Sequence, residues 1–137
     1  MNVIKVELSK IIIDEKRQDQ IIVLKEKDGD RQFPIVIGFL EASSIKMQLS
    51  GIEAPRPMTH DLFIVAVKTL GAEVDQLVID KLVNNTFHAK LELKTRTGRK
   101  KVIDCRPSDG VALAVRSNAK IFVEEEVLKR SAIFKGN

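Results

Sequence analysis

Two short segments of this 137-residue chain place arginine, proline and acidic residues directly before an apolar run. One of them, Asp104 to Asp109, leads into the apolar residues 111–115. Proline suits the first position of a helix, because its missing N–H would be unpaired there anyway. The free N–H groups and the positive dipole end of a helix start attract anions. With Arg106 beside them, we predict a phosphate site, and Ser108 in the first turn can hold phosphate or satisfy the backbone.

The other segment, residues 55–61, has the same construction and precedes the apolar run 62–67. Arg56 offers a second guanidinium for bidentate phosphate binding, or for an ion pair that shapes the loop. Thr59 is the predicted cap of the following helix. His60 is the best candidate for a general acid or base, because histidine side chains titrate near neutrality; its alternative role is a capping or loop hydrogen bond.

The aspartates of both segments have two interpretations. Asp61, Asp104 and Asp109 offer the carboxylate oxygens that Mg²⁺ or Mn²⁺ prefers, and such a cation can activate water against a phosphodiester. Equally, an acid in a first turn complements the helix dipole and caps free N–H groups. If Asp109 pairs with Arg106, the phosphate site is largely neutralised, so the site is either metal-dependent or satisfied by its own ion pair. Arg116, about two helical turns after Asp109, could extend a basic surface, although we expect a solvated charge.

Both segments, together with residues 33–38 and 41–42, closely resemble the bifunctional nuclease (BFN) domain family in order and spacing. The resemblance runs from about residue 3 to about residue 134. It implies a small α+β domain with nuclease activity on RNA and DNA. Cys105 and Gly110 stand where the resemblance leads us to expect small residues, usually alanine.

The chain length predicts a single domain over residues 1–137, long enough to form a hydrophobic core. One cysteine excludes an intramolecular disulfide, and neither a signal peptide nor a membrane span is visible, which predicts a cytoplasmic protein without membrane association. The net charge of +4 permits phosphate contacts. Without Trp or Tyr, nucleic acid would be held by its backbone more than its bases. No organic cofactor is indicated, because Gly-rich phosphate loops and dinucleotide fingerprints are missing.

Hydrophobic periodicity and turn signals predict an α+β fold in which a mostly antiparallel mixed sheet packs with three to four helices. The expected strands are 3–13, 20–27, 32–37, 73–82, 86–94, 100–103 and 121–123, and the expected helices are 38–49, 61–70, 107–117 and 124–130. The helix at 61–70 is apolar on every side, which predicts a central, buried position. The order strand, strand, strand, helix occurs twice, which suggests a duplicated unit and places Glu41 and Asp109 at equivalent points of two first turns.

Our leading hypothesis is a metal-assisted nuclease. His60, Asp61 and Asp109 would be catalytic, Arg56, Arg106, Ser108 and Arg116 would bind substrate, and Asp61, Asp104, Asp109 and Glu41 would hold the metal. The alternative is a non-catalytic, oligomeric interaction or nucleic-acid-associated module in which the Arg and Asp motifs are structural. Self-association, most simply as a homodimer, is expected in either case, because exposed strand edges need covering.

Overall fold

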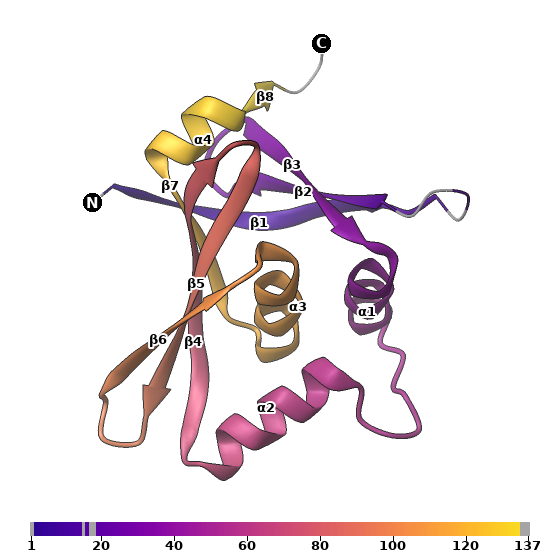
Figure 1. Cartoon of the computed structure of the whole chain (residues 1–137), viewed down its shortest axis with the longest axis vertical. Coiled ribbons are helices and arrows are strands. Elements are labelled where there is room, and N and C mark those ends of the chain that lie inside the picture. The colour runs from indigo at the N-terminus through magenta and orange to yellow at the C-terminus, as the bar shows by residue number, and fades with distance from the viewer. Residues whose placement is uncertain (1, 15, 17–18, 135–137) are drawn as a thin grey trace.

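The computed structural model describes residues 2–14, 16 and 19–134, which form one eight-stranded sheet and four helices (Figure 1). The strands are β1 (Val3–Ile12), β2 (Asp19–Glu26), β3 (Arg31–Gly38), β4 (Ala72–Val83), β5 (Thr86–Thr95), β6 (Lys100–Cys105), β7 (Lys120–Glu124) and β8 (Ile133–Phe134). The helices are α1 (Phe39–Leu49), α2 (Thr59–Thr69), α3 (Pro107–Ser117) and α4 (Glu125–Ser131). The predicted α+β class is confirmed, and the short strand β8 is an addition to it. Among the described helices, none is long and apolar enough to cross a membrane.

Two antiparallel meanders make up most of the sheet, whose order is β6-β5-β4-β7-β1-β2-β3-β8. In the second meander, Asn84 and Asn85 join β4 to β5 with φ of 51° and 62°. Asparagine tolerates this left-handed conformation, which a two-residue hairpin turn needs. Strand β7 connects the meanders, because it pairs antiparallel with β1 and parallel with β4. That parallel pair makes the sheet mixed, as predicted.

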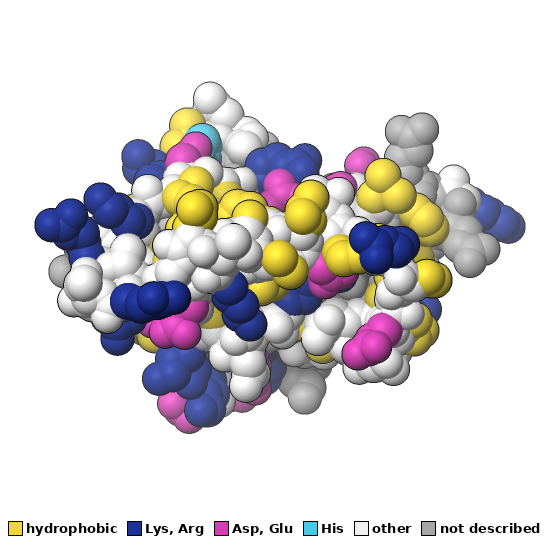
Figure 2. Space-filling view, turned by 90° about the horizontal axis from the view of Figure 1, so that it is seen from below, with side chains coloured by type: hydrophobic (Ala, Val, Ile, Leu, Met, Phe, Trp, Pro, Cys, Tyr) yellow, Lys and Arg dark blue, Asp and Glu magenta, His cyan; other side chains and the backbone are white. Residues whose placement is uncertain are grey.

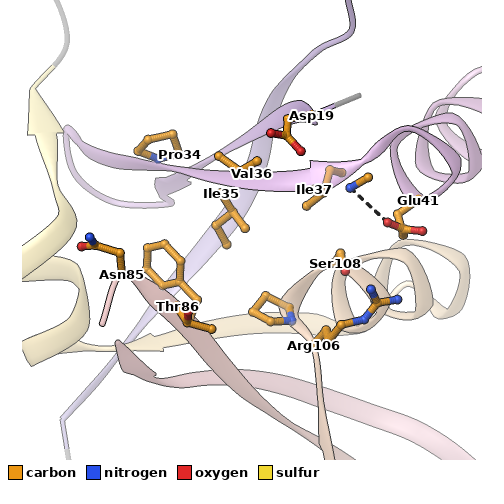
Figure 3. Close-up of a pocket in the computed structure, with 13 residues that line it drawn as sticks. Asp19, Pro34, Ile35, Val36, Ile37, Glu41, Asn85, Thr86, Arg106 and Ser108 are labelled. Atoms are coloured by element: carbon orange, nitrogen blue, oxygen red, sulfur yellow. Dashed lines mark hydrogen bonds between the residues drawn. The ribbon is translucent and has the colours of Figure 1, made fainter. Parts of the chain in front are cut away.

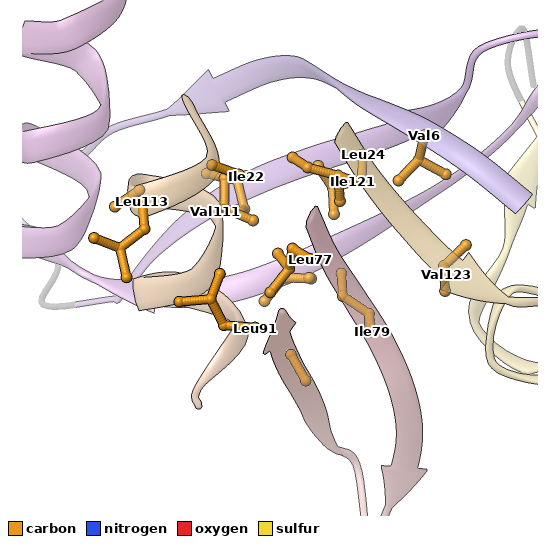
Figure 4. Packing of buried hydrophobic residues seen from close by; sticks show 14 of the residues in the cluster. Val6, Ile22, Leu24, Leu77, Ile79, Leu91, Val111, Leu113, Ile121 and Val123 are labelled. Carbon is orange, nitrogen blue, oxygen red and sulfur yellow. The ribbon is translucent and has the colours of Figure 1, made fainter. Parts of the chain in front are cut away.

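The central helix is α3, which lies against the concave side of the sheet (Figure 1). Figure 4 shows Val111 and Leu113 beside the sheet residues Ile22, Leu77 and Leu91. Small residues let α3 approach the strands closely, and a Cβ on residue 110 would lie 3.2 Å from the Cys105 sulfur and closer still to Leu77. A methyl group at position 110 would therefore require the end of the Leu77 side chain to shift.

The prediction that the apolar helix α2 is central was wrong. Within α2 only Val67 is buried, and the side chain of Leu62 is 61% exposed. Helix α2 lies at the edge of the helical layer, in contact with α3 and with β4. It also begins at Thr59, with Met58 at the cap position, so Thr59 is not the cap that the sequence suggested.

The repeated order of three strands and a helix is present as predicted, in β1-β2-β3-α1 and in β4-β5-β6-α3. Glu41 and Asp109 are each the third residue of their helix, so they occupy equivalent places. Asp61 is the third residue of α2 as well. Three helices of the layer therefore carry an acid at the same position of their first turn.

Candidate functional site

The three equivalent acids make different contacts. Glu41 accepts a hydrogen bond from the backbone N–H of Gly38 at 3.0 Å, and Asp61 accepts one from the N–H of Met58 at 3.0 Å. Each carboxylate thereby folds back over the start of its own helix and caps it. Asp109 does not, and no side chain among the described residues caps α3. The first N–H groups of α3 therefore lack the carboxylate that the equivalent acids supply in α1 and α2.

Asp109 instead reaches across to α2. Its Oδ1 lies 3.1 Å from His60 Nε2, and the other ring nitrogen, Nδ1, lies 3.1 Å from the Ser44 hydroxyl of α1. Burial raises the pKa of Asp109, but hydrogen bonds from His60 and Arg106 outweigh it and hold that pKa below its usual value. The carboxylate is therefore ionised at neutral pH. It then accepts a hydrogen bond from His60 Nε2–H, and in that tautomer Nδ1 accepts a hydrogen bond from the Ser44 hydroxyl.

Arg106 occupies the second oxygen of Asp109. Its Nε and Nη2 lie 3.0 and 2.8 Å from Asp109 Oδ2, while 67% of its side chain is exposed. The other edge of the guanidinium, at Nη1, has no partner among the described carboxylates. This is the ion pair that the sequence left open, and it neutralises much of the charge of Arg106. The guanidinium nevertheless keeps donors at Nη1 for an incoming anion.

Arg116 forms the second ion pair of the layer and ties all three helices together. Its Nε lies 2.9 Å from Asp61 Oδ1, and its Nη2 donates to the backbone oxygen of Ser44 at 3.2 Å. Only 5% of its side chain is exposed, so the expectation of a solvated charge was wrong. Burial raises the pKa of Asp61, yet hydrogen bonds from the Met58 backbone and from Arg116 bring it below its usual value.

A cavity of about 390 Å³ opens in front of α3, between the edge of β3 and the turn into β5 (Figure 3). Arg106 and Ser108 lie at one end of it, and Asn85 and Thr86 at the other. Ser108 is only 7% exposed, and its hydroxyl makes no hydrogen bond to any described residue. Its oxygen is not among the fully buried polar atoms without a partner, so the hydroxyl is open to the cavity that it lines beside the start of α3.

The two segments that the sequence singled out thus meet at the contact between His60 and Asp109. Not every predicted residue joins them. Asp104 is 74% exposed and pairs with Lys90 at 3.1 Å on the sheet, and Arg56 is exposed in the loop before α2 without an ion pair to any described residue.

The predicted metal ligands do not converge. Among the described residues there is no group of three or more His, Cys, Asp or Glu side chains placed to hold a metal ion. Glu41 caps α1, Asp61 is engaged by Arg116, and both oxygens of Asp109 have partners. In this arrangement the residues do not fit a carboxylate-bound cation, for which several free oxygens must face one point.

Two kinds of site residue were missed from the sequence. Ser44 gave no periodic signal, because it lies on nearly the opposite side of α1 from Ala42, although both are buried. Asn85 and Thr86 gave none, because a turn sequence does not reveal which distant helix it faces. Cys105 is unsuited to act as a thiol nucleophile, since burial, followed by the charge of Asp109, raises its thiol pKa to about 11.

Comparison with known proteins agrees with the resemblance seen in the sequence. The family model described as the bifunctional nuclease domain matches residues 22–136. Uncharacterized proteins from two strains of Mycobacterium tuberculosis are each 37% identical over 123 residues, which cover 90% of this chain and 73% of the relative. The match over most of the chain, together with these relatives, shows that this chain belongs to the bifunctional nuclease domain family.

Proposed function

We propose that this protein hydrolyses phosphodiester bonds of RNA and DNA at the start of α3. The observation that carries the proposal is the Ser108 hydroxyl, which lines the cavity and makes no hydrogen bond to any described residue. It lies beside an exposed guanidinium and a helix start that has no side-chain cap among the described residues. Hydroxyl, helix N–H groups and arginine together are the donors that bind phosphate oxygens. Membership of the nuclease-related family supports phosphate of nucleic acid as the anion.

In this proposal the phosphate lies against the free edge of Arg106 and against Ser108. Asp109, held by His60 and Arg106, orients the attacking water through a remaining lone pair. As the water oxygen bonds to phosphorus, the P–O bond to the leaving oxygen breaks, the water's proton passes to Asp109 and the leaving oxygen takes a proton from solvent. The ion pair of Arg116 with Asp61 keeps α2, and so His60, in place against α3. Arg56, exposed in the loop before α2, would contact a neighbouring phosphate.

No step of this mechanism is routed through a metal, since the predicted ligands do not come together. Whether the activity depends on Mg²⁺ or Mn²⁺, as the sequence predicts, is tested by adding each metal or the chelator EDTA. We place the activity in the cytoplasm, as the sequence predicts, and propose a homodimer as the working form.

The test is hydrolysis of labelled single- and double-stranded RNA and DNA by highly purified protein, with Mg²⁺, with Mn²⁺ and with EDTA. Asp109→Ala and Ser108→Ala should each lower the rate at least about tenfold, because a hydrogen bond to a charged group is worth roughly 1.5–3 kcal/mol. Lys129→Ala, at an exposed position of α4, is the control and should leave the rate unchanged. Equal rates in all three variants would identify a contaminant as the nuclease.

A second function is favoured by the internal pairing of the charges. Arg106 and Arg116 each face an aspartate, which is also what a non-catalytic interaction module would use to hold its helices. In that case the purified protein cleaves nothing, and its affinity for nucleic acid hardly changes with salt. Phosphate neutralisation at a real binding site would instead give a steep fall of affinity with salt.

A further inference from the structure

We propose that the cavity in front of α3 binds one nucleotide as a whole, with a single phosphate at α3 and the base at the turn into β5. This inference rests on the proposed function, because it names the part of the nucleic acid that the same site holds. It goes further in assigning a nucleoside subsite and a limit of one phosphate.

The phosphate end is defined by three groups. Ser108 is 7% exposed and its hydroxyl has no hydrogen-bond partner, the N–H groups at the start of α3 have no side-chain cap, and Arg106 has one free guanidinium edge, all as judged among the described residues. All three lie at the same end of the cavity (Figure 3). A phosphate held there would occupy only that end, and the cavity of about 390 Å³ would stay largely empty beyond it.

Part of the cavity lining is apolar and suits a flat ring. Pro34, Val36, Phe87 and Pro107 contribute to it, and Val36 is exposed on β3 whereas the residues on either side of it are buried. The ring of Phe87 is held by Phe33, with centroids 5.6 Å apart and an angle of 37° between the rings. Bases stack on such surfaces irrespective of their identity.

The far end offers hydrogen bonds of both kinds. The Asn85 side chain has donors and an acceptor, and the Thr86 hydroxyl can act as either. Strand β8 covers only Arg31 and Gln32 of β3, so the outer edge of the remaining strand, residues 33–38, faces the cavity without a neighbouring strand. Amide side chains and strand edges are groups that can bond the edge of a base.

Two acids at the rim set the limit of one phosphate. Asp19 and Glu41 both line the cavity, and the charge of Glu41 reaches Arg106, whose pKa is raised first by its hydrogen bond to Asp109 and further by Glu41. Carboxylates accept hydrogen bonds from ribose hydroxyls, as in dinucleotide sites. A second or third phosphate would be repelled by them. The cavity is therefore suited to a strand terminus or a mononucleotide, and not to a nucleoside triphosphate.

Calorimetric titration of the full chain with AMP, adenosine, inorganic phosphate and ATP tests this assignment. AMP should bind at least about tenfold more tightly than phosphate or adenosine alone, because it occupies both ends of one cavity. ATP should bind more weakly than AMP. Equal affinities for AMP and inorganic phosphate, or tighter binding of ATP, would overturn the nucleotide subsite.

Two substitutions test the phosphate end and the base end of the cavity separately. Ser108→Ala should weaken AMP and inorganic phosphate alike, by about tenfold. Asn85→Ala should weaken AMP and leave phosphate binding unchanged. Asn118→Ala is the matched control, because Asn118 has the same left-handed backbone, with φ of 55°, at the opposite end of α3 and outside the cavity. If Asn118→Ala weakens AMP binding as much as Asn85→Ala does, the base subsite is wrong.

The titrations also separate this inference from the proposed function. Binding of AMP with the expected variant pattern, in a protein that cleaves no nucleic acid, keeps the nucleotide site and ends the nuclease proposal. Hydrolysis of nucleic acid without measurable AMP binding would keep the nuclease proposal and end the proposed nucleotide site.

Discussion

At the scale of single residues, position in a helix does not decide what an acid does. Glu41, Asp61 and Asp109 are all third residues of a first turn, and the sequence predicted the equivalence of Glu41 and Asp109. The sequence could not predict that Glu41 and Asp61 cap their own helices whereas Asp109 contacts His60 of α2. That difference depends on His60 and Arg106, which reach Asp109 from another helix and from the preceding cap position.

The lowered pKa values of Asp61 and Asp109 predict acid sensitivity. For both, the folded-state pKa lies below that of the unfolded chain, so the stability they contribute is fully present above the ordinary aspartate pKa of about 3.9 and is lost as pH falls through the lowered values. Urea unfolding at pH 7 and pH 3 should show a smaller loss of stability in Asp109→Asn than in the parent. Asp104→Asn, at a 74% exposed carboxylate, is the control, and a pH response matching that of Asp109→Asn would contradict the assignment.

The buried ion pair of Arg116 with Asp61 is expected to matter more for folding than the surface pairs. Asp61→Asn leaves the guanidinium buried without its carboxylate, which should cost about 2 kcal/mol of unfolding free energy, less than a fully buried pair because Asp61 is partly exposed. The comparison is Asp104→Asn, which breaks the exposed pair with Lys90 and should cost under about 0.5 kcal/mol. Chemical denaturation of both variants at neutral pH measures the difference.

At the scale of elements, the positions of the strands and helices along the chain could be predicted from the sequence. How deeply each helix is buried could not. Turn residues and alternation located the strands of both meanders, because these signals are local. Burial is not local. An apolar segment such as 62–67 looked central, yet α3 fills the core, since its small residues allow the closest approach to the sheet.

Close packing of α3 predicts that Gly110→Ala destabilises the protein even though alanine favours helix. The added Cβ would overlap Leu77, and such overpacking costs about 1–3 kcal/mol, which exceeds the gain in helix propensity of about 1 kcal/mol. Thermal unfolding should show a lower midpoint for Gly110→Ala and partial recovery when Leu77→Val is added. A midpoint equal to or above that of the parent would show that α3 is not packed as tightly as described.

At the scale of the whole molecule, an apolar surface lies over α2 and the end of α1. Figure 2 shows hydrophobic side chains gathered across the face on which α2 lies. The exposed large apolar residues there are Leu49, Ile52, Leu62, Val65 and Leu70. On α2 the residues Leu62, Val65, Ala66 and Thr69 form one uncharged stripe. Contiguous exposed apolar surface of this kind is typical of an interaction site.

We predict that this stripe pairs with the α2 stripe of a second copy. A stripe without basic residues does not attract nucleic acid, whereas two antiparallel copies join apolar surface to apolar surface with their helix dipoles opposed. Leu62→Glu should shift the mass measured by light scattering from dimer to monomer. Val102→Glu, at a comparably exposed site on the edge strand β6, should not. A dimer that survives the first change and is lost on the second would place the interface at the strand edge, as edge covering alone would suggest.

The position of β7 has a further consequence, for the time course of folding. Because β7 pairs with β1 on one side and with β4 on the other, the two meanders have no shared strand until residues 120–124 are available. Each meander consists of neighbouring segments and can form early. The two meanders join into one sheet only through contacts between distant parts of the chain, which form slowly. During synthesis on a ribosome, both halves would therefore emerge with an open edge, and the shared core would be completed last, together with the cavity between β3, β5 and α3.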